Sequence, residues 1–580
     1  MFIRIKTKTS KKEPNLFRKS VQIVESFRQD GKVKQKIVKH VGVAHDEKQL
    51  LALKELAISI QIAIENDGDL SLFSPDDLTK DILVPKKDTT TNREIEYSDE
   101  DYNVDIRSLE EQSRIITGIH DIYGGLFDEL HLERIFDKKT SSSTIDAFKN
   151  IVLSRIAKPD SKASSVDMLE ENFGIKLDLS KVYRMMDALD DNAIEKLNTL
   201  SYNITKKLFN DKIDVIYFDA TTLYFESFSE DEGEDSIRKN GYSKDLKFNQ
   251  PQVVLALMVT KEGLPIGYEA FSGDTFDGHT LIPSLKILRD KYNIDKVVYV
   301  ADSGMFNKNN LEGLEKLEEY DFNYIVGARI KNLSKDIQGK ILKKDDYISL
   351  NNDIEVKNIT LNNGRKLVVT YSAKRAKKDK ADREKGIEKL RAKLKGNRSV
   401  KSHLSNQGYK KYLQLEHNSD ANKSCDIAIT LNEDKIALDA LWDGLKGLIV
   451  NESSTLSNDE ILTQYNNLWQ VEESFRITKH DLKIRPIYHW KPSRVRAHLA
   501  ISYAAFMLTR YLEHRVAVQY KKLSPKRIKN LLLSVQISIL ISKDKNIKYA
   551  IPSNTKVDVK RIYNLMEKGL KTTPYILEKM

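Results

Sequence analysis

The segment Asp214-Val-Ile-Tyr-Phe-Asp219-Ala-Thr-Thr-Leu-Tyr-Phe225 decides how the middle of this chain folds. Its β-branched and aromatic residues predict a strand, and its nearly unbroken apolar character predicts burial on both faces. Asp219 interrupts the apolar run near its centre. Because a carboxylate is costly to bury without a partner or a metal ion, Asp219 is a candidate functional residue.

The elements that follow extend this strand into an α/β fold. With a hairpin turn at 261–265 between the second and third strands, the pattern predicts three antiparallel strands and then right-handed crossovers that add parallel strands, which is the ribonuclease H-like order. Asp302 lies at the end of one apolar strand, where such sheets place their ligands, and this strand is expected beside that of Asp219. The later strands are predicted at 252–260, 266–271, 296–301 and 323–328, and the helices at 281–292 and 309–319.

A third acidic residue lies in Tyr465-Asn-Asn-Leu-Trp-Gln-Val-Glu472-Glu-Ser-Phe-Arg-Ile-Thr-Lys479. The spacing predicts one helix with a shared face. That face carries Tyr465, Leu468, Glu472, Phe475, Arg476 and Lys479. The alternative is an amphipathic helix with Leu468 and Phe475 in the core and Glu472 paired to Arg476 or Lys479.

The three separated acids suit a metal site. Each acid alone fits a capping or salt-bridge role equally well, but Asp219, Asp302 and Glu472 together, in this fold order, favour metal binding. Carboxylates without histidine or cysteine ligands favour hard cations, Mg²⁺ or its substitute Mn²⁺. Two such ions, about 3.5–4 Å apart, would serve an in-line displacement at phosphorus.

The motifs around these acids resemble those of the DDE transposases of bacterial insertion sequences. The resemblance rests on Phe218-Asp219-Ala-Thr-Thr, Ala301-Asp302-Ser-Gly-Met and Tyr465…Glu472…Lys479, with 273–280 resembling a loop of the same branch. That branch carries a Tyr-x2-Arg-x3-Glu-x6-Lys signature. The resemblance implies that Asp219, Asp302 and Glu472 bind metal and that Tyr465 and Lys479 contact the transposon end.

One signature position departs from the branch. Leu468 stands where the signature has arginine, so the arginine's role against phosphate is lost or passes to Arg476. Glu473 is the neighbouring acid that could be mistaken for the ligand, but helical phase and spacing favour Glu472.

Basic and aromatic residues follow the last acid. Arg485, Arg494 and Arg496 predict a track for DNA, with solvated surface as the alternative. His489 and His498, like His279 earlier in the chain, could contact phosphate or could be packed or capping residues. Trp469 and Trp490 could stack on an unpaired base, although large aromatic residues more often belong to a core.

The bulk composition favours a polyanionic partner. The net charge is +10 and the pI about 9.0. A proteome that is rich in lysine throughout would also produce this excess of positive charge. Cys425 is the single cysteine, which excludes a disulfide framework and a cysteine zinc cluster and fits a reducing, cytoplasmic setting. The most apolar segment, 497–508, is too short to span a membrane.

The chain divides into seven predicted parts. In order they are a small basic β module with a helix, an acidic linker, a helical and possibly DNA-binding domain, the first part of the ribonuclease H-like core, a β-rich insertion, the second part of the core with Glu472, and a C-terminal helical region. Their bounds are 1–66, 67–107, 108–210, 211–330, 331–455, 456–525 and 526–580. Within the third part, a glycine turn followed by a helix with Lys181 and Arg184 resembles a helix-turn-helix in outline.

The expected function is cut-and-paste DNA transposition. The protein would bind terminal inverted repeats, hydrolyse the end phosphodiester, and direct the freed 3′ hydroxyl at double-stranded target DNA. Pairing two ends implies at least a homodimer. Two rival functions remain: a ribonuclease H-like nuclease without strand transfer, and a catalytically inactive DNA-binding protein.

Overall fold

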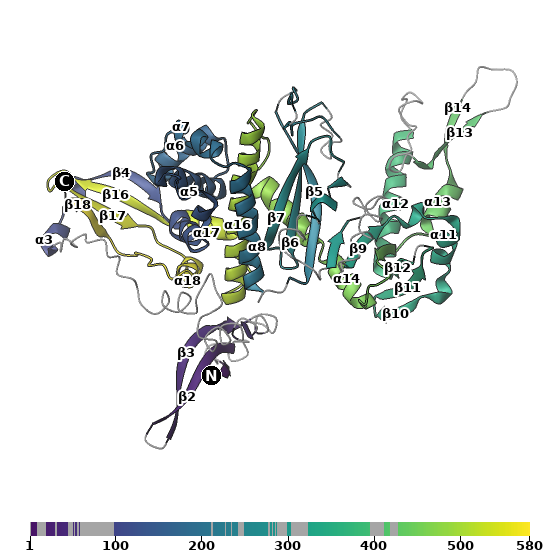
Figure 1. Cartoon of the computed structure of the whole chain (residues 1–580), viewed down its shortest axis with the longest axis horizontal. Helices are drawn as coiled ribbons and strands as arrows, with labels where there is room; N and C mark the ends of the chain where they lie inside the picture. The colour runs from purple at the N-terminus through teal and green to yellow at the C-terminus, as the bar shows by residue number, and fades with distance from the viewer. Residues whose placement is uncertain are drawn as a thin grey trace. The chain divides into compact units, whose positions relative to one another are not determined.

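The chain folds into two compact units, shown in Figure 1 as a computed structural model. Unit 1 comprises Met1–Ile213, Ala220–Phe276 and Gln470–Met580, and unit 2 comprises Asp214–Asp219 and Asp277–Trp469. The structure describes residues 2–7, 19–29, 32–44, 50, 53, 54, 57, 98–209, 213–226, 228–233, 235–241, 249–276, 279, 280, 282–284, 286, 298–302, 323–362, 364–394, 411–417 and 427–579.

Several predicted segments lie outside these residues. The predicted helix at 309–319 does so entirely, as does Cys425. The predicted helices at 47–65 and 281–292 and the linker at 67–107 do so for most of their length.

Unit 1 begins with a small antiparallel sheet, as the sequence predicts. Its strands run in the order β1-β2-β3. Arg4 ties the three strands together, because its guanidinium donates to the side-chain oxygens of Gln22 on β2 and Gln35 on β3. The bounds are β1 Phe2–Thr7, β2 Lys19–Gln29 and β3 Lys32–Ala44.

A group of helices follows in unit 1. The predicted helix pair around Gly174 is present, and Gly174 ends the first helix with a φ of +68°, a left-handed conformation that glycine adopts without strain. Asp178 occupies the N-cap position of the second helix of the pair. The main helices are α5 Ser142–Ala157, α6 Lys162–Phe173, α7 Leu179–Asp187 and α8 Asp191–Leu208, preceded by α3 Asp99–Tyr102, a π-helix at His120–Gly124 and α4 Gly125–Glu129.

The second half of β5 (Val215–Tyr224) continues in unit 1 into a hairpin of β6 (Gln252–Thr260) and β7 (Pro265–Ser272). Helix α8 covers the outer edge of β7, as Figure 1 shows. The Asn198 amide donates to the Tyr268 carbonyl and accepts from the Tyr268 N–H, so it takes the place of a further strand. The edge of this sheet is therefore closed by a side chain.

The long helix α16 (Pro492–Gln519) packs against this hairpin. Its Tyr503 ring lies 4.6 Å from the Tyr268 ring, measured between centroids. Its Arg510 donates to the carbonyl oxygens of Glu262 and Gly263 in the β6–β7 turn. Among the described residues, no helix is both long and apolar enough to cross a membrane.

The C-terminal part of unit 1 corrects a prediction. The region 526–580 was expected to be helical, but it contributes three strands to a sheet ordered β18-β17-β16-β4. Its alternating apolar and polar residues, such as those of Gln536–Ser542, pair with a strand more than four hundred residues earlier. The elements are β4 Leu109–Ile116, α17 Pro525–Leu533, β16 Gln536–Ser542, β17 Ile547–Pro552, α18 Val557–Leu565 and β18 Tyr575–Lys579.

Unit 2 is built around a mixed sheet ordered β10-β11-β12-β15-β9-β8-β5. The strands β5, β8 and β9 are parallel, and the remaining neighbours are antiparallel. The predicted parallel pairing of the strand before Asp302 with that of Asp219 is thereby confirmed. The strands are β8 Val298–Ala301, β9 Asn323–Ala328, β10 Ile348–Asn351, β11 Ile354–Thr360, β12 Lys366–Tyr371 and β15 Leu445–Val450.

Helices and a separate strand pair complete unit 2. The segment Ala373–Leu394 forms a helix that exposes most of its charged side chains. The elements are α11 Lys335–Leu342, α12 Ala373–Leu394, β13 Leu413–His417, β14 Ile427–Leu431, α13 Glu433–Ala440 and α14 Asn458–Asn466. The part predicted as a β-rich insertion thus holds both helices and strands.

Candidate functional site

Asp219 and Asp302 occupy matching positions on neighbouring strands of unit 2. The parallel pairing of β5 and β8 aligns Val215 with Val298 and Tyr217 with Val300. When this register is continued by two residues along both strands, Asp302 lies beside Asp219. Neighbouring strands lie about 4.8 Å apart, so the two carboxylates emerge as a pair.

The burial of these two strands supports the same pairing. Asp219 is half-buried, whereas its neighbours Phe218 and Ala220 are fully buried. Asp302 follows the last residue of β8 and is exposed. Both residues are therefore at least partly accessible to solvent.

The segment that carries the third acid is not the single helix that the sequence predicts. Helix α14 ends at Asn466, and α15 begins at Trp469 and runs to Arg476. Asn467 caps α14 with a ψ near 0°, which turns the chain out of the helix. The three-to-four periodicity continues across this break, so the sequence pattern does not reveal it.

The break separates the two ends of the predicted signature. Tyr465 lies on α14 in unit 2, where the Lys446 ammonium is 4.2 Å from its ring centroid. Glu472 and Arg476 lie on α15 in unit 1, and Lys479 lies in the π-helical turn Ile477–Asp481 that follows. The predicted DNA contacts therefore belong to two units.

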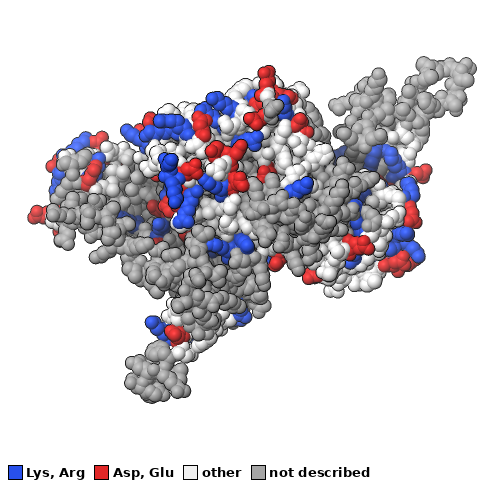
Figure 2. Space-filling model, viewed as in Figure 1, with Lys and Arg blue, Asp and Glu red and all other residues white. Residues whose placement is uncertain are grey.

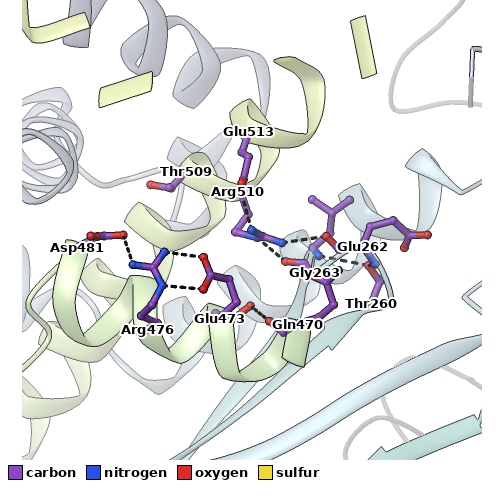
Figure 3. Close-up of polar contacts among 12 residues, drawn as sticks. Thr260, Glu262, Gly263, Gln470, Glu473, Arg476, Asp481, Thr509, Arg510 and Glu513 are labelled. Carbon is purple, nitrogen blue, oxygen red and sulfur yellow. Dashed lines mark hydrogen bonds and ion pairs between the residues drawn. The ribbon is translucent and has the colours of Figure 1, made fainter. Parts of the chain in front are cut away.

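The two neighbouring acids of α15 have different surroundings, and Figure 3 shows those of Glu473. Glu473 accepts two hydrogen bonds from Arg476, from Nε at 2.7 Å and from a terminal nitrogen at 2.5 Å. Arg476 also contacts Asp481 at 3.4 Å. Glu472 is exposed and makes no hydrogen bond or ion pair with any other described residue.

The pKa shifts agree with this division. The hydrogen bonds from Arg476 hold the pKa of the Glu473 carboxyl below its ordinary value, and those same bonds raise the pKa of Arg476. Both groups stay charged at neutral pH and stabilise each other. The ion pair predicted as an alternative role for Glu472 is thus made by Glu473 instead.

A second network lies next to the first in Figure 3 and anchors α16. Arg510 pairs with Glu513, and the same guanidinium holds the β6–β7 turn through the carbonyls of Glu262 and Gly263. Gly263 has a φ of +76°, and a Cβ there would lie 1.9 Å from the Arg510 guanidinium. Glycine is therefore required at this turn on both conformational and steric grounds.

Lys479 connects the segment after α15 to β5 within unit 1. Its ammonium donates to the hydroxyl of Thr221. Thr221 follows Asp219 by two residues in the same strand, and side chains two apart in a strand emerge on the same face. The sequence offered no sign of this contact, because the two residues are 258 positions apart.

The chain after Lys479 runs beside the end of β5. Ile487 forms a parallel bridge with Phe225, and the Arg485 guanidinium lies 5.3 Å from the ring centroid of Tyr224. Two aromatic residues of this stretch, Tyr488 and Trp490, are 59% and 60% exposed. The alternative of a core position for Trp490 is therefore wrong, and Trp469 is likewise 46% exposed.

Arg494 is held by a carboxylate on α7. It donates to both Asp187 oxygens, at 2.7 and 2.8 Å, and its guanidinium lies 4.7 Å from the Tyr183 ring centroid. The bond to Asp187 raises the pKa of Arg494 and lowers that of Asp187. Arg494 would have to exchange this partner for a phosphate to bind DNA.

Two of the predicted histidines lie in a buried basic cluster. His498 bonds the Ile484 carbonyl at 2.9 Å and accepts from Lys162 at 3.4 Å, which fixes both groups inside unit 1. Burial lowers the pKa of His489 to about 3, with Lys162 and Arg155 adding to the effect, and it lowers the pKa of His498 as well. Both histidines are neutral at pH 7 and packed rather than exposed to a phosphate.

Charge is mixed over the described surface that Figure 2 shows. Lysine and arginine side chains alternate there with acidic ones and do not form one unbroken patch on this face. In the part of the chain that the structure describes, no three histidine, cysteine, aspartate or glutamate side chains form a group that could hold a metal ion. Asp219 and Asp302 belong to unit 2 and Glu472 to unit 1.

Comparison with known proteins finds transposases. A family profile described as "Transposase DDE domain" matches residues 210–508, and one described as "IS1634 family transposase, N-terminal domain" matches residues 5–67. No curated protein matches the chain.

Several solved structures match in part. One is the "Mos1 transposase paired-end complex with left transposon end", at 13% sequence identity and a TM-score of 0.13, over 32% of this chain and 60% of that chain. The chain therefore spans less than two thirds of that protein's length.

Proposed function

We propose that this chain, which belongs to the family of insertion-sequence DDE transposases, hydrolyses the phosphodiester at each end of its own DNA element and joins the freed 3′ hydroxyl to target DNA. The observation that carries the proposal is the register of β5 and β8, which brings Asp219 and Asp302 side by side. The DDE profile spans both strands and α15.

In this proposal Asp219, Asp302 and Glu472 hold divalent metal. Their donor set of carboxylates alone fits Mg²⁺, with Mn²⁺ as a substitute, and two ions per site are expected. Bound metal would supply an activated water or hydroxyl and stabilise the leaving oxygen. The chain's own contribution is to fix the two strand carboxylates by backbone register and to leave Glu472 without an internal partner.

Glu472, rather than Glu473, is proposed as the third acid. A carboxylate that accepts two hydrogen bonds from an arginine is already neutralised, and freeing it would leave Arg476 without its main partner. Glu472 requires no such exchange, because no other described residue binds its carboxylate.

The fold is proposed to be ribonuclease H-like. A strand, an antiparallel hairpin and then two parallel strands follow one another as β5, β6, β7, β8 and β9, which is the order that this fold requires. In the same proposal the residues between 331 and 455 interrupt the core, and the parts at 1–66 and 108–210 supply DNA-binding modules.

The proposed DNA contacts differ in the partners they have in the structure. Lys479 donates to the Thr221 hydroxyl, and the Arg485 guanidinium lies against the Tyr224 ring. Arg476 and Arg494 would each exchange a carboxylate for a phosphate. Tyr465 is the proposed contact from unit 2.

The proposal is tested by cleavage of DNA that carries the repeats flanking this gene. With Mg²⁺ or Mn²⁺, the purified protein should cut at the repeat ends, leave free 3′ hydroxyls and join them to a second duplex as a dimer bound to two ends. Asp302→Asn should bind the same DNA without cutting it. Cutting that ignores the repeats would favour a general nuclease, and binding without cutting by the unaltered protein would favour an inactive DNA binder.

A further inference from the structure

We propose that Arg155, on α5, is a positioning residue for the proposed cleavage, because it fixes the end of the helical segment that carries Glu472. The inference rests on the proposed function and adds a residue to it. The segment runs from Trp469 to Asp481, since the π-helical turn follows α15 without a break. Arg155 is 3% exposed and, among the described residues, donates only to backbone carbonyls. Any effect of Arg155 on cleavage must therefore pass through the segment that it holds.

The guanidinium of Arg155 joins two parts of unit 1. One terminal nitrogen donates to the carbonyl oxygens of Leu482 at 3.3 Å and Lys483 at 3.0 Å, and the other donates to that of Asp160 at 3.3 Å. Leu482 is the C-cap of the helical segment, and Asp160 lies between α5 and α6. The planar guanidinium can bond both sides at once, because its donors form a rigid fork.

The backbone at Lys483 needs to be held. Its φ is +44°, a left-handed conformation that residues other than glycine rarely adopt. Glycine is the usual residue where a helix ends in this conformation. The N–H groups of Leu482 and Ile484 donate back to carbonyls of the π-helical turn, at 2.9 and 3.1 Å. The bond from Arg155 to the Lys483 carbonyl therefore stabilises a turn that the local sequence does not favour.

A second pair of side chains holds the next carbonyl. His498, on α16, donates to the Ile484 carbonyl at 2.9 Å, and its other ring nitrogen accepts from Lys162 at the start of α6. His498 and Lys162 are each 4% exposed. Arg155, Lys162 and His498 together form what we call the buried clamp. Through it, three consecutive carbonyls at 482–484 are bonded by side chains of the surrounding helices.

The buried clamp contains a cation but no carboxylate. Neither Arg155 nor Lys162 forms an ion pair with another described residue. Burial lowers the pKa of Arg155 to about 10, so its guanidinium stays charged at neutral pH. Its charge is balanced by backbone carbonyls, and a buried cation that lost them would be costly. The end of the helical segment therefore cannot shift away from α5 without a large penalty.

The buried clamp acts on Glu472 through the length of the helical segment. Glu472 lies ten residues before Leu482, which at about 1.5 Å per residue is about 15 Å of helix. Over that length, a tilt of about 4° displaces the backbone of Glu472 by about 1 Å. A displacement of this size can lower the rate of a chemical step about 100-fold. Arg155 should therefore matter for the rate of cleavage although it lies outside the proposed site.

The test measures amide hydrogen exchange and end cleavage in the same proteins. Arg155→Met removes the donors and keeps a long side chain. Exchange within 477–484, followed by mass spectrometry without DNA or metal, should become about tenfold faster, because fewer bonds oppose local opening. Cleavage of repeat ends at saturating DNA should fall about 100-fold. The dissociation constant for the ends should change by less than about threefold, since no proposed DNA contact is removed.

A conservative variant covers the case in which Arg155→Met does not fold. Arg155→Lys keeps the charge, but its single nitrogen cannot bond the carbonyls of Asp160 and Lys483 in the same way as the fork. Exchange within 477–484 and the rate of cleavage should therefore change in the same directions as in Arg155→Met, by smaller factors.

Lys357→Met is the matched control. Lys357 is also buried and also donates to carbonyls at the end of a helix, those of Lys340 at 2.6 Å and Lys343 at 3.2 Å on α11. That helix carries none of the proposed site residues. Lys357→Met should speed exchange around 335–343 and leave both the exchange within 477–484 and the rate of cleavage unchanged.

Three results would overturn the inference. They are exchange within 477–484 that rises no more than in the rest of the chain, cleavage that is unaltered although this exchange is faster, and a loss of cleavage matched by an equal loss of end binding. Failure of the unaltered protein to cut repeat ends would instead count against the proposed function. The exchange measurement needs no DNA, so it would still decide whether Arg155 holds the segment.

Discussion

The two adjacent glutamates of α15 differ in how their charges are satisfied. Glu473, Arg476 and Asp481 neutralise one another, whereas the carboxylate of Glu472 makes no hydrogen bond or ion pair with any other described residue. Adjacent carboxylates of the same type thus have opposite surroundings. The paired glutamate is held within the chain, and the unpaired one is available to the metal and DNA of the proposed function.

The largest effect should come from the strand acids with which Glu472 is proposed to act. Asp219→Asn and Asp302→Asn should each lower the rate of end cleavage by about 10³-fold or more, since each removes a charged metal ligand. Binding of the end, measured by gel shift, should change little. Cleavage within tenfold of the unaltered protein would contradict the pairing of these acids.

A smaller effect, on DNA binding, is expected from Lys479, which follows Arg476 by three residues. Lys479→Met should weaken end binding about tenfold and reduce the slope of log affinity against log salt by about one, as loss of one phosphate contact requires. Thr221→Val serves as the control, since it removes the hydroxyl partner but keeps the cation. Equal salt slopes for Lys479→Met and the unaltered protein would show that Lys479 is structural.

The ion pair between Glu473 and Arg476 should contribute to the stability of the fold more than to the rate of cleavage. Arg476→Gln leaves Glu473 without its partner, so the free energy of unfolding should fall by about 1 kcal/mol, a value kept low because both side chains are partly exposed. Urea denaturation followed by circular dichroism measures this change. A large loss of DNA binding at unchanged stability would show that Arg476 leaves Glu473 to bind phosphate, as the sequence predicts.

The smallest effect on the free energy of unfolding should come from His489, which follows α15 in the chain. The pKa of His489 lies near 3 in the folded chain and about 6.5 in the unfolded chain, so the unfolded chain binds more protons between these values. His489 therefore makes its full contribution to the free energy of unfolding only above about pH 6.5. That contribution decreases as the pH drops toward 3. Between pH 7 and pH 6 the loss should be about 0.7 kcal/mol.

Comparison with His489→Asn isolates that contribution. Urea denaturation of both proteins at pH 7 and pH 6 should give a flatter pH dependence for the variant, because other titrating groups cancel in the difference. The same slope in both proteins would show that His489 is accessible to protons in the folded state.

The sequence predicts the strands of the site well because their signals are local. The apolar runs around Asp219 and at 252–260, and the Gly263 turn, identify elements whose observed bounds differ by at most a few residues. The placement of Asp302 next to Asp219 follows from the same order, since parallel crossovers leave few alternatives.

What the sequence could not reveal depends on residues distant in the chain. The break at Asn467 keeps the helical spacing intact, and the strand at 536–542 acquires its identity from β4, far earlier in the chain. Likewise, Lys479 donates to Thr221 on β5, which is 258 positions away.

The most direct measurement of the central claim compares Glu472→Gln with Glu473→Gln in Mg²⁺-dependent cleavage of the repeat ends. The two variants change the same group at neighbouring positions of one helix, so differences in expression and charge cancel. We expect Glu472→Gln to abolish cleavage but to bind ends normally, and Glu473→Gln to cut DNA and to unfold more easily. Cleavage by Glu472→Gln, or its loss only in Glu473→Gln, would contradict the assignment of Glu472 as the third metal ligand.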